Sequence, residues 1–299
     1  MSVLIVVFSL YWVGKAFGET SFENLRSHIT RRDVGWMLSM ILLLAVAKWI
    51  AAFAWKRILE GITGKRMASL TSQVWLRTNI AKYFPSNLLH YAGRHYFSSS
   101  LGVTQKVIGI ANVLEILIAL VLSSLIMLAS LPFSYRQLSL IFSEFTLPWT
   151  VYLLLVPGGG LVIIGLATAL KRFWIPLLDV QTWHIGKLLT AVYLQSMFFL
   201  IMGTVFCVTT LQLDGRSFNV SSVFYLIFVA NISWFLGFIV PGVPGGIGVR
   251  EAIMLVFLKQ QYAIEVVLMS ALLFRLITIC SDYVSFFSTF LYKHAESQL

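Results

Sequence analysis

The sequence predicts an all-α, polytopic integral membrane protein with about seven or eight spans. Of its 299 residues, 59% are hydrophobic and only 11% are charged, and the mean hydropathy is +0.86. Soluble domains carry roughly 25% charged residues, so these values exclude a soluble enzyme and an ordinary nucleic-acid-binding domain. The net charge of +10 is typical of the cytoplasmic loops of a membrane protein.

The spans can be placed by length, because an α-helix needs about 20 apolar residues to cross a bilayer. A short first helix is expected to end near Phe17, without a cleavable signal peptide. The clear candidates after it are residues 34–55, 107–131, 147–170, 188–211, 220–240 and 266–291. Most connections between them are short, so residues 1–299 are expected to form one transmembrane domain with no soluble module.

Two further segments are apolar but interrupted. Residues 70–101 are broken at Pro85, Ser86 and Asn87, and residues 241–262 open with Pro-Gly-Val-Pro-Gly-Gly-Ile-Gly before becoming helical. Such breaks free backbone groups that hydrocarbon cannot satisfy, so this backbone must be buried in protein or line a wet cavity. Re-entrant or broken helices are therefore expected, and their paired occurrence suggests an inverted repeat with halves at about 1–145 and 146–299.

Loop charge predicts the orientation, because lysine and arginine are enriched in cytoplasmic loops. The connections expected on the cytoplasmic side hold most of the basic residues outside the spans: Lys56, Arg57, Lys65, Arg66, Arg77, Lys82, Lys106, Lys171, Arg172 and Lys187. The alternate connections hold Arg136 and Arg216. The basic residues before Val34 oppose this assignment, but acidic residues share that loop.

Four charged residues lie within apolar runs, where a charge is costly and therefore suggests a function. Lys48 is expected to extend toward the membrane surface. Arg275 and Asp282 share a face of the last helix about 10 Å apart, so each needs another partner. We expect Glu115 and Asp282 to face protein or water and to pair with arginines. An ion pair that only fixes helix packing is the alternative.

The sharpest motif is the glycine-rich turn that leads directly into a helix near Gly248. Its backbone N–H groups and the helix N-terminus would suit a phosphate, and Arg250 would add a fork-shaped donor. Glu251 could cap the same helix or pair with an arginine elsewhere. The turn does not match a nucleotide-binding P-loop, and a glycine hinge that lets helices approach closely is the alternative.

Other chemistry has little support in the sequence. His90 and His95 are five positions apart and do not share a helix face as metal ligands would. Cys207 and Cys280 both lie in apolar runs, so a disulfide is not expected. No catalytic set can be assembled, and we expect no enzyme activity, no metal and no cofactor.

These motifs resemble the lysylphosphatidylglycerol synthase transmembrane-region family, whose members include flippase-like proteins. The segment at 244–252, Pro-Gly-Gly-Ile-Gly-Val-Arg-Glu-Ala, is close to that family's signature, and the segment at 81–94 resembles its Pro-centred block ending in arginine. Glu115 and Arg275 also occupy matching places. Ser86 departs from the pattern, since glycine is common there. The resemblance extends over nearly the whole chain.

The resemblance implies a lipid-translocating domain, which in the synthases moves aminoacylated phosphatidylglycerol between leaflets. No soluble aminoacyl-transferase domain accompanies it here, so no aminoacyl transfer is expected. The expected substrate is an anionic phospholipid or a polyprenyl-phosphate-linked glycolipid for cell-envelope biogenesis, in the inner (cytoplasmic) membrane. The expected substrate-binding residues and their charge partners are Arg94, Gly245, Gly246, Gly248, Arg250, Glu251 and Arg275, with Glu115 and Asp282.

Two other functions stay open at this stage. The chain could be a non-transporting scaffold or accessory subunit of an envelope glycosyltransferase or lipid synthase, or an intramembrane enzyme acting on a polyprenyl phosphate. Charge around broken helices favours transport over the scaffold, and the missing acid/base set weighs against the enzyme. The expected partners are the bilayer, an anionic lipid and an envelope enzyme, with no nucleic acid.

Overall fold

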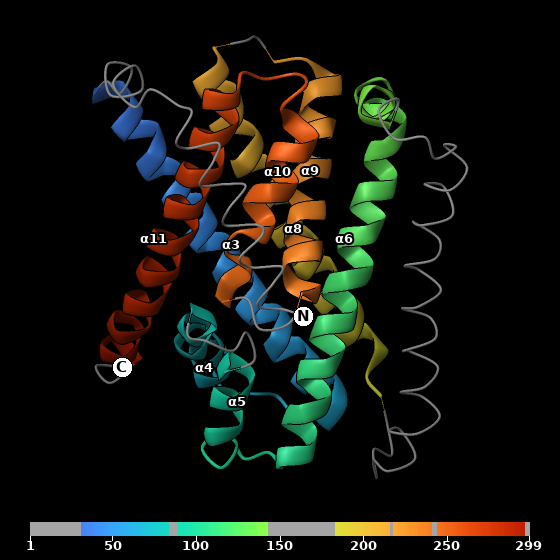
Figure 1. The fold of residues 1–299 in the computed structure, drawn as a ribbon. Coiled ribbons are helices and arrows are strands. Elements are labelled where there is room, and N and C mark those ends of the chain that lie inside the picture. Colours follow the sequence, from blue (N-terminus) through green and yellow to red (C-terminus); the bar gives the residue numbers. More distant parts are fainter. Residues whose placement is uncertain (1–30, 84–88, 143–182, 216–217, 241–243, 297–299) are drawn as a thin grey trace.

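The computed structural model describes residues 31–83, 89–142, 183–215, 218–240 and 244–296, and every regular element in these ranges is a helix (Figure 1). Five helices are long and apolar enough to cross a membrane: Val34–Thr63, Gln105–Ser139, Ile185–Asp214, Val220–Ile239 and Ile264–Leu291. The all-α, multi-pass architecture is confirmed. The expected helix ending near Phe17 and the span at 147–170 lie outside the described residues.

The long helices are α3 (Arg31–Thr63), α6 (Gln105–Phe142), α8 (Ile185–Asp214), α9 (Val220–Ile239) and α11 (Ile264–Glu296). Several extend beyond the predicted spans because polar turns continue the helix outside the apolar run. The prediction ended the second of these at Leu131, but α6 continues through Pro132. Proline is tolerated in a membrane helix when its neighbours satisfy the freed backbone groups.

Local sequence defines the ends of two of these helices. Gly215 takes a left-handed conformation (φ 71°) directly after α8, where a residue with a Cβ atom would be strained. Asn219 starts α9, and its side chain accepts a hydrogen bond from the Ser221 amide at 3.1 Å.

Both interrupted segments contain a short α-helix next to a break in the helical backbone. The lower hairpin consists of α4 (Leu70–Asn79), the 3₁₀ turn η1 (Ile80–Tyr83) and α5 (Leu89–Tyr96); the upper hairpin consists of α9, the 3₁₀ turn η3 (Pro244–Gly246) and α10 (Val249–Leu258). Figure 1 shows them entering from opposite ends of the bundle, and η1 contacts η3 where they meet. A ten-residue helix spans about 15 Å, half of a bilayer core about 30 Å thick.

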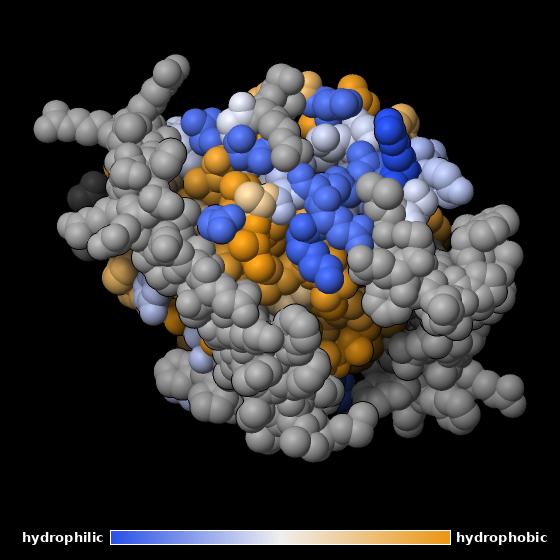
Figure 2. Space-filling view, turned by 45° about the horizontal axis from the view of Figure 1, so that its top comes forward, coloured by the Kyte–Doolittle hydropathy of each residue, from blue (hydrophilic) through white to orange (hydrophobic). Residues whose placement is uncertain are grey.

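The surface of the bundle divides into an apolar flank and two polar ends. In Figure 2, hydrophobic residues occupy much of the described face, and a cluster of hydrophilic residues reaches down into them. The end that holds the lower hairpin is strongly basic, with Lys56, Arg57, Lys65, Arg66, Lys106 and Lys187. At the opposite end, the described helices carry Arg31, Arg32, Arg136 and Lys259 together with the acidic residues Asp33, Asp214 and Glu265.

Candidate functional site

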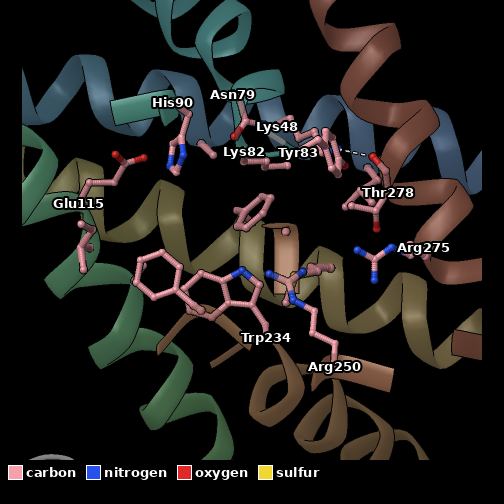
Figure 3. Close-up of a pocket in the computed structure, with 18 of the residues that line it drawn as sticks. Lys48, Asn79, Lys82, Tyr83, His90, Glu115, Trp234, Arg250, Arg275 and Thr278 are labelled. Atoms are coloured by element: carbon pink, nitrogen blue, oxygen red, sulfur yellow. Dashed lines mark hydrogen bonds between the residues drawn. The ribbon is translucent and has the colours of Figure 1, made fainter. Parts of the chain in front are cut away.

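A cavity of about 160 Å³ lies between the two hairpins and the surrounding helices. Figure 3 shows Asn79, Lys82 and Tyr83 of the lower hairpin on one side of it and Trp234 and Arg250 of the upper hairpin on the other. Its other polar lining comes from α3, α5, α6, α8, α10 and α11, and includes Lys48, His90, Tyr91, Arg94, Glu115, Gln195, Glu251, Arg275 and Thr278. A cavity this rich in charge within an apolar bundle indicates a functional site.

Asp282 of α11 is the centre of the largest charge cluster beside this cavity. Its carboxylate is fully buried and pairs with Lys48 Nζ at 2.5 Å and with Lys82 Nζ at 2.9 Å. It also accepts hydrogen bonds from Asn79 Nδ2 at 2.9 Å and from Tyr83 Oη at 2.5 Å. In the second of these bonds the Tyr83 hydroxyl is the donor and the carboxylate the acceptor. One carboxylate therefore joins α3, α4, η1 and α11.

Lys48 does not extend toward the membrane surface, so that prediction is wrong. Its ammonium also donates to the Thr278 carbonyl and to Ser281 Oγ, both at 2.7 Å. With Asp282, these acceptors use all three donors of the ammonium. The prediction that Asp282 pairs with an arginine is also wrong, because its ion-pair partners are two lysines.

Arg94 of α5 and Glu115 of α6 form a second buried ion pair. The Arg94 guanidinium also donates to Asn112 Oδ1 at 3.0 Å, and the other Glu115 oxygen accepts from Trp75 Nε1 at 2.6 Å. The arginine lies against the rings of Trp55, Trp75 and Tyr91, at 5.0 Å, 5.4 Å and 5.0 Å. The expected pairing of Glu115 with an arginine is confirmed. Arg94 lines the cavity but is only 1% exposed.

The glycine-rich turn has the predicted helix start, but its amides are not all open. Gly245, Gly246 and Gly248 have φ angles of 57°, 74° and 82°, which favour glycine. Glu251 accepts from the Gly248 amide at 2.8 Å and also pairs with Arg275. It therefore caps its own helix and binds an arginine of another helix, the two roles foreseen for it. The Gly248 amide is consequently not free to contact an anion while Glu251 holds it.

Arg250 lies in the first turn of α10 and is half-buried. Within the described part of the chain its Nε is buried without a hydrogen-bond partner, and its other nitrogens form no ion pair there. Two glycines make room for its side chain: a Cβ atom on Gly237 would lie 2.6 Å from Arg250 Cγ, and one on Gly246 would lie 2.6 Å from Arg250 Nε. These glycines thus position an arginine that lines the cavity.

The structure brings all the expected site residues to one region, the cavity and its immediate partners. The sequence analysis did not single out Lys82, Tyr83 or Asn79 as cavity residues. Lys82 was counted as a loop charge, which is wrong because it lines the cavity and pairs with Asp282. Its position just before the Pro85 break, in a segment already expected to re-enter the membrane, was the signal that could have identified it. Pro85 and Ser86 lie outside the described residues.

Comparison with known proteins does not identify a family, since no family model matches the chain and no curated protein matches it.

Proposed function

We propose that this protein moves an anionic lipid between membrane leaflets, with the phosphate entering the central cavity while the tails remain in the bilayer. The observation that carries the proposal is a cavity with five basic side chains, placed between the lower and upper hairpins at opposite ends of the bundle. Half-helices that meet at mid-membrane form the substrate sites of many transporters.

The arrangement offsets the main cost of translocation, which is removing a charged headgroup from water. Arg250 forms no ion pair among the described residues, and guanidinium binds phosphate through two parallel hydrogen bonds. The carboxylates Glu115, Glu251 and Asp282 limit the net positive charge, so that the anion can also leave. No cofactor or enzymatic step belongs to this proposal.

The finer features of the topology are part of the same proposal. We place the basic end of the bundle in the cytoplasm, because basic residues are retained there. The lower hairpin then opens from the cytoplasmic side and the upper hairpin from the opposite side, as the halves of an inverted repeat would. With seven or eight spans and this topology, the chain would be a flippase-like member of the lysylphosphatidylglycerol synthase transmembrane-region family in the inner membrane.

Reconstitution tests the proposal. The purified full chain is placed in liposomes with labelled phosphatidylglycerol, aminoacylated phosphatidylglycerol, phosphatidic acid or a polyprenyl phosphate, and inward movement of each label is measured. We expect at least one lipid to move faster than in protein-free liposomes. Rates no higher than the protein-free rate for all four lipids would refute transport and favour the scaffold.

Two variants test the site itself. Arg250→Lys should slow transport although it keeps the charge, because lysine cannot copy the bidentate geometry. Gly246→Val should also slow it, since the added side chain takes the space of Arg250. Arg136→Lys, at an exposed position on α6, is the matched control and should transport normally. Normal transport by folded Arg250→Lys and Gly246→Val would show that the turn is only a hinge.

A further inference from the structure

We propose that the lipid accepted by this cavity ends in a phosphate monoester, with no headgroup beyond the phosphate. The inference rests on the proposed function and narrows its substrate class. The charge balance of the cavity carries it, and the size of the cavity is compatible with it.

The charge balance is obtained by matching each basic side chain with its partner. The ionised groups of the described cavity and its immediate partners are Lys48, Lys82, Arg94, Arg250 and Arg275, opposed by Glu115, Glu251 and Asp282. Five cations against three carboxylates leave an excess of two positive charges. The sequences of segments 84–88 and 241–243, which lie outside the described residues, contain no charged residue.

The excess can be assigned to particular residues. Arg94 and Arg275 each have a carboxylate of their own, and Lys48 has three acceptors. Lys82 shares Asp282 with Lys48, and its side chain is 22% exposed. Arg250 has no ion pair among the described residues. Lys82 of the lower hairpin and Arg250 of the upper hairpin are therefore the two cations with donors to spare.

A monoester phosphate matches this excess. It carries a charge of about −1.5 to −2 near neutral pH, because its second ionisation has a pKa near 6. A phosphodiester such as phosphatidylglycerol carries a single negative charge and would leave one buried cation unbalanced. Uncompensated charge in a low-dielectric site is costly, so the cavity should favour the dianion.

The size of the cavity is compatible with a bound phosphate group. A protein cavity of about 150 Å³ holds a benzene molecule, which has six heavy atoms, and this cavity measures about 160 Å³. A phosphate group has five heavy atoms and fits. The remaining lining includes Phe198, Met202 and Phe274, which suit the first carbons of a lipid tail.

The test compares lipids that differ only in the headgroup. Phosphatidic acid and phosphatidylglycerol with identical acyl chains are each reconstituted with the full chain, and the rate of leaflet exchange is measured. We expect phosphatidic acid to move about tenfold faster or more, the effect of one additional charge-assisted contact. Equal rates, or faster phosphatidylglycerol, would overturn the monoester inference but leave lipid transport intact. If neither lipid nor a polyprenyl phosphate moves, the proposed function fails as well.

A pair of variants tests whether Lys82 carries one of the two excess charges. Lys82→Gln removes one excess charge, and the preference for phosphatidic acid over phosphatidylglycerol should fall about tenfold in the folded protein. Lys259→Gln removes an exposed charge at the end of α10 and should leave the preference unchanged. If Lys82→Gln proves unstable, Lys82→Arg keeps the charge and should keep the preference. A folded Lys82→Gln protein with the wild-type preference would contradict the proposal.

Discussion

Arg94 in the lower hairpin and Arg250 in the upper hairpin both follow a helix break and both line the cavity, but their surroundings differ. Arg94 binds Glu115 and Asn112 and lies against three aromatic rings. Arg250 lies between two glycines and forms no ion pair among the described residues, although the Nε atoms of both arginines lack a hydrogen-bond partner there. The same residue type after a similar break thus holds the bundle together in one hairpin and presents unused donors in the other.

The largest effect is expected from removing the paired arginine. Arg94→Met leaves Glu115 buried without its counterion, and breaking such a pair costs about 3–5 kcal/mol. Thermal unfolding of the purified protein should show the loss. The double variant Arg94→Met with Glu115→Leu should regain much of the stability, because an apolar pair can replace a buried ion pair. Equal stability of wild type and Arg94→Met would show that Arg94 does not stabilise the bundle, contrary to the difference described between the two hairpins.

A smaller loss of stability is expected when the charge cluster around Asp282 is disrupted. Asp282→Asn keeps the size of the side chain but leaves Lys48 and Lys82 without a counterion, at a cost of about 3 kcal/mol. Adding Lys48→Met should restore part of it, and the coupling between the two changes can be read from a double-mutant cycle. Additive losses would show that the pair contributes little.

In the upper hairpin, a small substitution should affect transport more than stability. Gly237→Ala places a Cβ atom 2.6 Å from Arg250 Cγ, so the arginine must leave its position. We expect the transport rate to fall about tenfold, the size of a lost charge-assisted contact. Gly186→Ala, where nothing lies within 4 Å of the new atom, is the matched control and should transport at the wild-type rate. Unchanged transport by Gly237→Ala would separate Arg250 from substrate binding.

The smallest effect is expected from the equivalent change in the lower hairpin. A Cβ atom on Gly93 would lie 3.1 Å from Thr78 Cγ2, a contact that a slight shift relieves. Alanine also favours the helix by about 0.5–1 kcal/mol over glycine, so Gly93→Ala should change the free energy of unfolding by less than about 1 kcal/mol. Transport should be unaffected. A tenfold loss of transport would mean that both hairpins contact the substrate in the same way.

Much of the fold could be predicted from sequence, because membrane spans and helix breaks depend on residues that are close together in the sequence. The apolar runs predicted the long helices, and the Pro/Gly breaks predicted the short helices α4, α5 and α10 beside them. The cost of a charge in hydrocarbon also identified Glu115 and Asp282 correctly as groups that need partners.

The partners themselves could not be predicted, because pairing depends on which helices lie side by side. The snorkelling argument for Lys48 used only its distance along the chain to Lys56. It could not reveal that α11 brings Asp282 within 2.5 Å. The turn at Gly246 was likewise interpreted as a set of open amides, since the sequence does not show that Arg250 fills that space or that Glu251 takes the Gly248 amide.

The position of Asp282 near the C-terminal end of the chain has a consequence for biogenesis. Synthesis is vectorial, so α3 and the lower hairpin are made long before the helix that carries their counterion. Lys48 and Lys82 must remain hydrated, or shielded by the insertion machinery, until α11 arrives. Completion of the charge cluster therefore coincides with insertion of the last described helix, and an assembly intermediate without α11 would expose two unpaired lysines to quality control.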